Sequence, residues 1–284
     1  MENEIASVIK YFAFFAYHPT LEEIYQFLQV KISKGQLQAE LDRLKYTPPQ
    51  YSMRKKISRK KLDNWRYKAY ILMLSLFPQI KLIGLSGSIS MMNAKEDDDI
   101  DLFIITGKNR LFTGRLITLV LAQLLRLRRI RKARYQKDKV CLNLFFDESN
   151  LKVPKFKQTE FVGHEVLQMK PVVVKSDMYK SFLMANQWVF KLFPNAQSQI
   201  NYKGVSHLRR DQSKITLFII ISNKIEQMLK SFQLHLINKH RTTEIITDTQ
   251  LWFHPDDFEH YLLQDVKRPG CSRFLVRPFP VDPK

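Results

Sequence analysis

The first fifty residues alternate apolar and polar positions at helical spacing. An apolar stripe within residues 5–17 predicts a first helix, which ends before Pro19. Thr20 and Glu23 stand three residues apart, which is the spacing of a capping box, and they predict the start of a second helix over Leu21–Leu28. The pattern therefore predicts two short helices joined by a turn.

A third helix is expected to begin at Ser33. Its leucines lie on one stripe, whereas polar residues such as Gln36 and Gln38 lie off it. Tyr51–Ile57 then predicts a short β excursion. Helix, capped helix, polar helix and β excursion follow the order of a winged helix-turn-helix, so we predict such a unit over residues 1–57. Winged helices bind nucleic acids or dock proteins, and both roles stay open.

The middle of the chain alternates strands with helices. One segment, Ile100–Thr106, is almost continuously apolar, which is typical of a strand buried on both faces. In order, the predicted elements are a helix at Ser58–Leu76, strands at Lys81–Leu85 and Ile100–Thr106, a helix at Lys108–Leu127 and a strand at Val140–Phe146. This order predicts a mixed α/β core over residues 58–155.

Helical periodicity dominates the rest of the chain. Helices are predicted at Phe161–Met169, Met178–Phe193, Ser213–His240 and Pro255–Val266, with turns at Pro171, Pro194-Asn195 and His254-Pro255. We therefore predict a helical domain over residues 156–267, followed by an extended or disordered tail at residues 268–284. The fold class predicted for the whole chain is α+β.

The chain carries a large positive charge. Its 46 Lys and Arg residues against 27 Asp and Glu residues give a formal net charge of +19. Such an excess is self-repelling unless a polyanion compensates it, which favours a nucleic acid as partner, with an anionic membrane surface as the alternative. The densest early cluster lies within Arg54–Lys61, either as a solvated helix face or as a contact with phosphates.

The remaining composition favours the cytoplasm. Cys141 and Cys271 lack the C-x-x-C spacing of metal or redox sites, and we expect them to be free thiols in a reducing compartment. Residues 1–10 do not have the pattern of a secretory signal. The longest apolar runs, Leu116–Leu125 and Leu217–Ile221, are shorter than the ~20 residues of a membrane-spanning helix. We therefore expect a cytoplasmic protein with no transmembrane segment.

Candidate chemistry lies between the first two predicted strands. Gly87 follows a strand and lets the backbone approach a phosphate, and Ser88 adds a hydroxyl and a backbone N–H at the start of a short helix. Asp99 and Asp101 leave the same face of the next strand, so their charges repel each other and favour a divalent cation. These residues predict Mg²⁺ on the two aspartates, beside a nucleotide held by Gly87 and Ser88.

The motifs Leu85-Ser86-Gly87-Ser88 and Asp99-Ile100-Asp101-Leu102 together resemble those of the polymerase-β-like nucleotidyltransferase superfamily. The resemblance covers about residues 80–146 and is specific at the level of the superfamily. It implies a mixed-sheet catalytic core, two Mg²⁺ ions (with Mn²⁺ as an alternative), an NTP donor and an added helical domain. Members of the superfamily extend nucleic acids, add CCA to tRNA, modify antibiotics, or nucleotidylate proteins and RNAs. The helical start and end of the chain are also similar to an uncharacterised group of bacterial nucleotidyltransferase-domain proteins.

The superfamily usually places a third carboxylate on a following strand, where this chain has Asn143. An amide oxygen ligates a metal weakly and cannot act as a base. Asp147 should lie about 13 Å further along the same strand face, and Glu165 would have to come from the helical part. His164 is expected on a helix surface. We take Asp99, Asp101 and Asn143 as the catalytic positions and leave the two other carboxylates as alternatives.

Three cations follow the strand that carries the aspartates. Lys108 and Arg110 are expected to contact the triphosphate from a loop, whereas Arg115 lies on the next helix. Solvent exposure and helix capping are the alternative. The residues Asp256 and Asp257 are expected in the first turn of a helix, so we assign no metal to them.

The sequence thus predicts a Mg²⁺-dependent enzyme that transfers NMP from an NTP to an acceptor. The positive charge favours RNA over DNA as that acceptor, with tRNA among the candidates. Two other functions stay open. Asn143 and the charge would suit a nucleic-acid-binding regulator with a weak or inactive site. Adenylylation of a small molecule or a protein would use the same residues.

Overall fold

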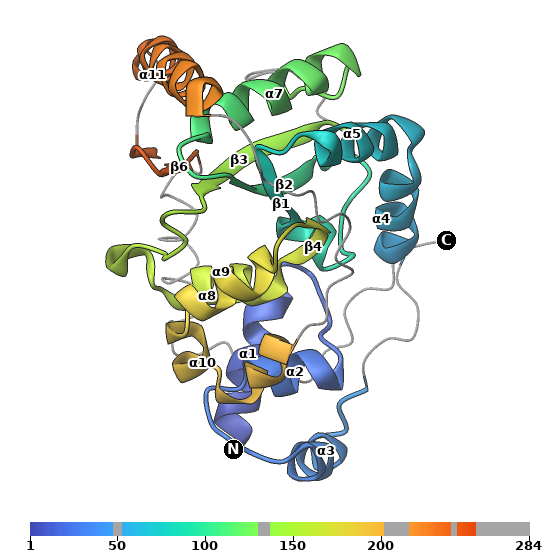
Figure 1. Cartoon of the computed structure of the whole chain (residues 1–284). Helices are drawn as coiled ribbons and strands as arrows, with labels where there is room; N and C mark the ends of the chain where they lie inside the picture. Colours follow the sequence, from blue (N-terminus) through green and yellow to red (C-terminus); the bar gives the residue numbers. More distant parts are fainter. Residues whose placement is uncertain (48–52, 130–136, 202–215, 240–242, 254–284) are drawn as a thin grey trace. The chain divides into compact units, whose positions relative to one another are not determined.

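The computed structural model describes residues 1–47, 53–129, 137–201, 216–239 and 243–253 (Figure 1). Over these ranges the protein is α+β, with eleven α-helices and a mixed six-stranded sheet, which confirms the predicted class. Within the described ranges, one compact unit comprises residues 1–50 and 189–198, and the other comprises residues 51–188 and 199–255. No helix of the described ranges is both long enough and apolar enough to cross a membrane.

The smaller unit contains the three predicted N-terminal helices. Its elements are α1 (Glu2–Phe14), α2 (Leu21–Phe27), α3 (Lys34–Arg43), most of α10 (Trp188–Leu192) and the first part of the 3₁₀ segment η2 (Pro194–Asn201). The Thr20 side chain accepts a hydrogen bond from the Glu23 N–H, and the Glu23 carboxylate accepts one from the Thr20 N–H at 2.8 Å. The predicted capping box is therefore confirmed, and it fixes the start of α2.

The predicted β excursion at Tyr51–Ile57 is wrong for its described residues. Residues 53–57 belong instead to helix α4 (Met53–Asp63), most of which is Arg and Lys. Their long unbranched side chains lose little rotamer freedom in a helix, and this favours the helix over a strand. Among the residues that the structure describes, no wing follows the third helix.

The prediction of a single helix at Ser58–Leu76 is also wrong, because the helix is interrupted at Asn64. Helix α4 ends just before this residue and α5 (Trp65–Leu76) begins just after it. The Asn64 side chain accepts a hydrogen bond from the Arg66 N–H at 2.9 Å and so caps the start of α5. Asn side chains compete in this way with the regular helical hydrogen bonds.

The larger unit is built on the sheet, whose strand order is β4-β1-β2-β3-β6-β5. β2 and β3 are parallel, whereas all other neighbouring strands are antiparallel. The strands are β1 (Ile80–Leu85), β2 (Ile100–Thr106), β3 (Val140–Asp147), β4 (Lys170–Val174), β5 (Ile245–Ile246) and β6 (Gln250–Trp252). The predicted bounds of β2 are confirmed, and those of β1 and β3 each differ by one residue.

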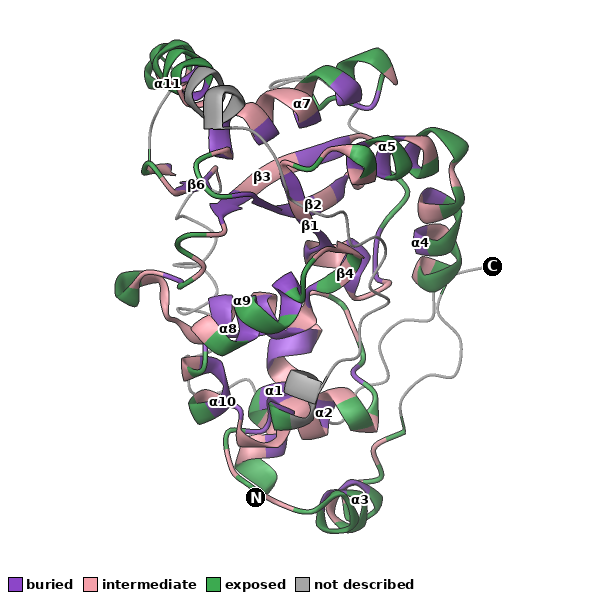
Figure 2. Cartoon of the chain, in the orientation of Figure 1, coloured by how far each residue is buried: buried purple, intermediate pink, exposed green. Residues whose placement is uncertain are grey.

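Helices cover both faces of this sheet (Figure 2). The helices of this unit not yet given are α6 (Gly87–Ser90), α7 (Leu111–Leu124), α8 (Glu160–Gln168), α9 (Met178–Ala185) and α11 (Thr216–Asn238), with a 3₁₀ turn η1 at Lys155–Lys157. On one face, Tyr70 of α5 and Phe112 of α7 are buried in the main apolar cluster. On the other face, the Phe182 ring of α9 lies 5.0 Å from the ring of Phe103 and 6.1 Å from that of Phe146. The central strands are therefore buried on both sides, as the apolar run in β2 predicts.

Part of the predicted helical domain at residues 156–267 completes the sheet instead. Pro171, where a turn is predicted, lies within β4, which pairs with β1 at the edge of the sheet. Proline has no N–H to donate and is tolerated in an edge strand, and the three valines that follow favour extended backbone. The sequence pattern also misses β5 and β6, whose two and three residues are too short to show a periodicity.

The helix predicted at Met178–Phe193 is divided at Asn186, whose buried side chain donates to the carbonyls of Leu151 and Phe182. The helix predicted at Ser213–His240 corresponds to α11. The helix predicted at Pro255–Val266, with Asp256 and Asp257, and the tail at residues 268–284 lie outside the described residues.

Candidate functional site

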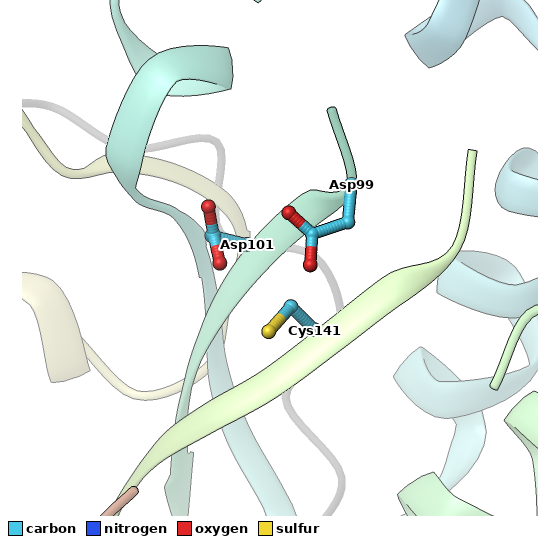
Figure 3. Close-up of side chains that lie close together, drawn as sticks. All are labelled: Asp99, Asp101 and Cys141. Carbon is cyan, nitrogen blue, oxygen red and sulfur yellow. The ribbon is translucent and has the colours of Figure 1, made fainter. Parts of the chain in front are cut away.

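Two acidic residues and a cysteine lie together at the beginning of β2. Asp99 directly precedes the strand and Asp101 is its second residue, so their side chains leave the chain on one side. Cys141 of β3 lies opposite Asp101 in the parallel pairing. One ligand atom from each of the three lies within 4.8 Å of the others, so this group could hold a metal ion (Figure 3).

The predicted Gly-Ser turn packs directly against Asp101. Gly87 begins α6 with a φ of +59°, a left-handed conformation that favours glycine. A side chain there would collide with the carboxylate, because a Cβ atom on Gly87 would lie 2.7 Å from Asp101 Oδ2. The Ser86 N–H also donates to the Asp101 carbonyl at 3.1 Å. The two motifs that carry the resemblance are therefore brought into contact.

Helix α8 brings a third carboxylate to the same place. Glu165 accepts a hydrogen bond from the Gly87 N–H, and its charge raises the pKa of Asp101. Burial raises the pKa of Glu165 itself to about 7, although the hydrogen bond from Gly87 acts in the opposite direction. The expectation that His164 lies on a helix surface is wrong, because α8 is buried on most of its sides and His164 is among its buried residues.

Negative charge in this group exceeds positive charge. Against the carboxylates of Asp99, Asp101 and Glu165 stands Arg129, whose Nη1 lies 2.7 Å from Asp99 Oδ2. That Oδ2 atom is buried, yet it accepts no well-aligned hydrogen bond from the described residues. Burial, together with the charges of Asp99 and Glu165, raises the pKa of Asp101. A proton or a cation would relieve such a buried excess of charge.

The Cys141 thiol is a hydrogen-bonding neighbour of this group. It donates to Asp101 and accepts a hydrogen bond from Arg129 Nη1 at 2.8 Å. Burial raises the pKa of the thiol, and the two nearby carboxylates add to this effect. Protonated sulfur is a weak ligand, so the carboxylate oxygens are the main donors that the group offers to a hard cation.

A buried lysine holds the loop that leads into Asp99. Lys61 of α4 is 4% exposed, and its Nζ donates to the carbonyls of Glu96 at 2.7 Å and Asp98 at 2.8 Å. The same ammonium lies 3.0 Å from an oxygen of Asp138. One turn earlier, the Ser58 hydroxyl accepts a hydrogen bond from the Ala94 N–H. The inner side of α4 therefore fixes the backbone immediately before Asp99.

Two groups were predicted from the sequence to donate hydrogen bonds to a phosphate, and both already have partners. The Gly87 N–H donates to Glu165, and the Ser88 hydroxyl donates to Asp98 Oδ2 at 3.1 Å. Asp98 Oδ2 also accepts from the Lys95 N–H at 2.8 Å. A phosphate that used the Gly87 and Ser88 groups would have to replace these carboxylates.

The third catalytic position predicted from the sequence reaches the group weakly. The Asn143 Nδ2 atom lies 3.5 Å from Asp101 Oδ1, at the long limit of a hydrogen bond. Asp147 is not a substitute, because it ends β3 beside Thr106 and accepts a hydrogen bond from the Arg110 N–H at 3.3 Å. Of the carboxylates considered from the sequence, Glu165 is the one that lies beside the two aspartates.

The structure places Lys108 and Arg110 away from the group, which corrects their prediction as phosphate ligands. They follow the far end of β2, whose seven residues span about 20 Å. There the Lys108 N–H donates to Glu148 at 2.9 Å, and Arg110 Nη1 donates to Asn223 at 2.8 Å. Arg115 is also engaged elsewhere, since Nη1 donates to Gln233 at 2.7 Å. A nucleotide at Asp99 and Asp101 is out of reach of these side chains.

Three residues of the group carry no motif that reveals them in the sequence. From the sequence, Cys141 is expected to be a buried thiol. Arg129 and Lys61 belong to two separate runs of basic residues. A buried carboxylate at Asp101 was the available signal, because it requires a partner from the neighbouring strand. The identity of that partner depends on the strand register, which periodicity does not give.

Comparison with protein-family models, with curated proteins and with solved structures found no match for this chain.

Proposed function

We propose that the protein is a divalent-metal-dependent nucleotidyltransferase, which moves NMP from an NTP to an acceptor. One observation carries the proposal: the Gly87 turn packs against Asp101, with Asp99 and Glu165 beside it. An acidic pair alone is common on protein surfaces. Here the acidic pair contacts a turn at which only glycine has room. Such an arrangement is expected where a metal ion and phosphates meet.

The residues suit a hard divalent cation. Among the described residues, three carboxylates share one cation, Arg129, and a buried oxygen of Asp99 lacks a well-aligned hydrogen bond. Asp99 and Asp101 would hold Mg²⁺ or Mn²⁺, with Glu165 as third carboxylate, because these ions prefer oxygen ligands. Such an ion would neutralise charge on the phosphates and orient the acceptor hydroxyl.

In the transfer, the acceptor oxygen forms a bond to the α-phosphorus of the NTP. The bond from this phosphorus to the bridging oxygen breaks, and pyrophosphate leaves with the electron pair of that bond. The acceptor hydroxyl loses its proton to a general base, and we assign this role to the Glu165 carboxylate. The amide of Asn143 cannot act as a base. Gly87 leaves room for the Asp101 carboxylate, which a Cβ atom at this position would approach to 2.7 Å.

Cation and nucleotide should bind in order. The Gly87 N–H and the Ser88 hydroxyl are engaged by Glu165 and Asp98, and these carboxylates would repel a bare triphosphate. A cation on the acidic group compensates that repulsion. We therefore expect NTP to bind measurably only when Mg²⁺ or Mn²⁺ is present.

One observation favours a second candidate, a non-catalytic binding protein. Arg129 already pairs with Asp99, and a guanidinium in that place can serve as a permanent substitute for a metal ion. In this case the acidic group is structural, and the protein neither binds cations there nor transfers nucleotides.

Mn²⁺ titration separates the two candidates. Purified full-length protein is titrated with Mn²⁺ in a calorimeter, beside Asp101→Asn and the control Asp97→Asn, an exposed carboxylate of the same loop. The enzyme proposal predicts binding by the native protein and by the control, and at least tenfold weaker binding by Asp101→Asn. Equal affinity in all three proteins, or no binding, would falsify it.

Transfer is then measured with each α-³²P-labelled NTP, Mg²⁺ and total RNA. The native protein and Asp97→Asn should label an acceptor, whereas Asp101→Asn should lose about 10³-fold in rate. Label on protein or on a small molecule, with none on RNA, would retain the transfer but change the acceptor class. Cation binding without any transfer would leave a metal-binding protein and refute the enzyme.

A further inference from the structure

Helix α4 has two sides with different partners. On its inner side, Arg54 Nη1 donates to Asn93 at 3.3 Å, and Ser58 and Lys61 hold the loop at residues 94–98. Its outer side carries four exposed cations, Lys55, Lys56, Arg59 and Lys60. The helix that fixes the backbone before Asp99 thus presents a basic face to solvent.

The four outer cations gather on one face by their spacing. Residues 55 and 59, and residues 56 and 60, stand one turn apart, so like charges are neighbours along the helix. The one acidic residue of α4, Asp63, pairs with Lys68 at 2.9 Å. Like charges at this spacing destabilise an isolated helix, and a bound polyanion would convert this repulsion into attraction.

An exposed aromatic residue follows this face within a few residues. Trp65, the first residue of α5, is 68% exposed, and the guanidinium of Arg66 lies 5.6 Å from the centre of its ring. A tryptophan this exposed leaves a large apolar surface in water. Cations along a helix together with an open aromatic ring are the combination by which proteins hold single-stranded nucleic acids.

We propose that the outer face of α4, with Trp65 and Arg66, binds a single-stranded nucleic acid and directs it toward Asp99 and Asp101. The phosphates would contact Lys55, Lys56, Arg59 and Lys60, and a base would stack on the indole ring. The distance to the acidic group is short, because Lys61 of the same helix touches the carbonyl of Asp98. The use of this strand as the acceptor rests on the proposed transfer, whereas its binding does not.

A membrane surface fits this face less well than a nucleic acid does. Helices that lie on membranes insert an apolar side next to their basic side. In α4 the apolar Leu62 packs instead against the main apolar cluster of the sheet, and Met53 at the start of the helix is its one exposed large apolar side chain. The exposed ring of Trp65 offers a stacking surface for a base, whereas one ring gives a helix little apolar area to insert into a membrane.

The binding test uses the full-length protein in EDTA without nucleotide, so that it is independent of transfer. A fluorescein-labelled 20-mer RNA of mixed sequence is titrated by anisotropy at several salt concentrations. The test protein replaces Lys55, Lys56, Arg59 and Lys60 by Gln, and the control replaces the exposed Lys152, Lys155, Lys180 and Lys224 by Gln, with the same change in charge. All eight side chains are exposed, so both proteins should fold.

We expect the α4 variant to bind about 100-fold more weakly at 0.1 M salt, with a salt slope reduced by about 3, and the control to change less than threefold. Trp65→Ala should weaken binding roughly tenfold and Trp65→Phe should restore most of it, whereas the exposed Phe156→Ala should have no effect. Equal losses in both charge variants would overturn the proposal. Binding to anionic vesicles that depends on α4, without RNA binding, would overturn it in favour of a membrane.

RNA labelling then tells the two proposals apart. If the α4 variant keeps Mn²⁺ binding but loses transfer to RNA, both proposals stand. If RNA binds through α4 but is never labelled, the proposed transfer fails and the binding face remains.

Discussion

Strand β2 has carboxylates near both of its ends, buried at the far end and half-buried at the near end, and the two ends differ in how those charges are compensated. At the far end, Glu226 of α11 accepts hydrogen bonds from the Phe112 N–H at 2.7 Å and the Thr113 N–H at 2.9 Å. Asp147 accepts from the Ser149 N–H at 2.9 Å. These carboxylates cap a helix and a turn, and hydrogen bonds from backbone N–H groups compensate their charges.

At the near end, the carboxylates face one another. Among the described groups, their donors are the Arg129 guanidinium, the Gly87 N–H, the Cys141 thiol and, at 3.5 Å, the Asn143 amide. The pKa of Asp101 is raised there, which means that folding makes its charge unfavourable. Burial of a carboxylate therefore does not by itself mark a site. An excess of carboxylates over donors is the feature that makes the near end a candidate site, because the fold retains it at a cost in stability.

Removing a carboxylate should therefore have opposite effects at the two ends. Glu226→Ala leaves two N–H groups of α7 without an acceptor and should lower the free energy of unfolding by about 2–4 kcal/mol. Asp101→Asn removes repulsion and should leave it unchanged or raise it by about 1 kcal/mol in EDTA. Urea unfolding followed by circular dichroism measures both. A large loss of stability in Asp101→Asn would mean that the near end is structural too.

The glycine turn at Gly87 adds a constraint of the backbone at the near end of β2. Gly87→Ala introduces a Cβ at a φ of +59° and 2.7 Å from Asp101 Oδ2, so it should lower the free energy of unfolding by about 1–3 kcal/mol. It should also weaken Mn²⁺ binding, because Asp101 has to move. Gly35→Ala is the matched control: a Cβ there meets nothing within 4 Å, and the change should stabilise α3 by about 0.5–1 kcal/mol. Unchanged Mn²⁺ affinity in Gly87→Ala would argue against contact between the turn and the cation site.

The smallest effect is expected in the pH dependence of stability. The pKa of Glu165 is raised from 4.5 to about 7, so between these pH values the folded chain keeps a proton that the unfolded chain has lost. The stability of the native protein in EDTA should therefore fall as pH rises through this window. Glu165→Gln removes the part of this loss that Glu165 causes and should gain about 1–2 kcal/mol over the native protein between pH 4.5 and pH 7, whereas the raised pKa of Asp101 retains the remainder.

The control for this measurement lies on the same helix. Glu160→Gln removes one charge from the first turn of α8, and its difference from the native protein should not grow over the same pH window. Added Mg²⁺ should stabilise the native protein more than Glu165→Gln. A parallel pH profile for the native protein and Glu165→Gln would show that this carboxylate is not strained by its neighbours.

Local chemistry was readable from the sequence. The bounds of β2 followed from its apolar run, and the start of α2 followed from Thr20 and Glu23, because both signals lie within a few residues. The acidic pair and the glycine turn were identified for the same reason. Their contact with each other follows from the pairing of β1 with β2, which joins neighbouring segments.

Long-range placement was not readable in the same way. Lys108 and Arg110 looked close to the aspartates in sequence, but an extended strand carries them to its other end. Glu165 is brought to Gly87 by the packing of α8, and Pro171 is tolerated because β4 is an edge strand. None of these outcomes depends on a periodicity, since each is set by which elements pack together.

The ammonium of Lys61 joins α4 to the loop at residues 94–98 by hydrogen bonds. Its three oxygen partners, the carbonyls of Glu96 and Asp98 and the carboxylate of Asp138, match the three protons of the group. The helix cannot slide along the loop without breaking all of them at once, so the two are expected to move as one body. A ligand of the outer face of α4 that shifted this body would then also shift the loop before Asp99. By thermodynamic reciprocity, this ligand and one at Asp99 would change each other's affinity by the same factor.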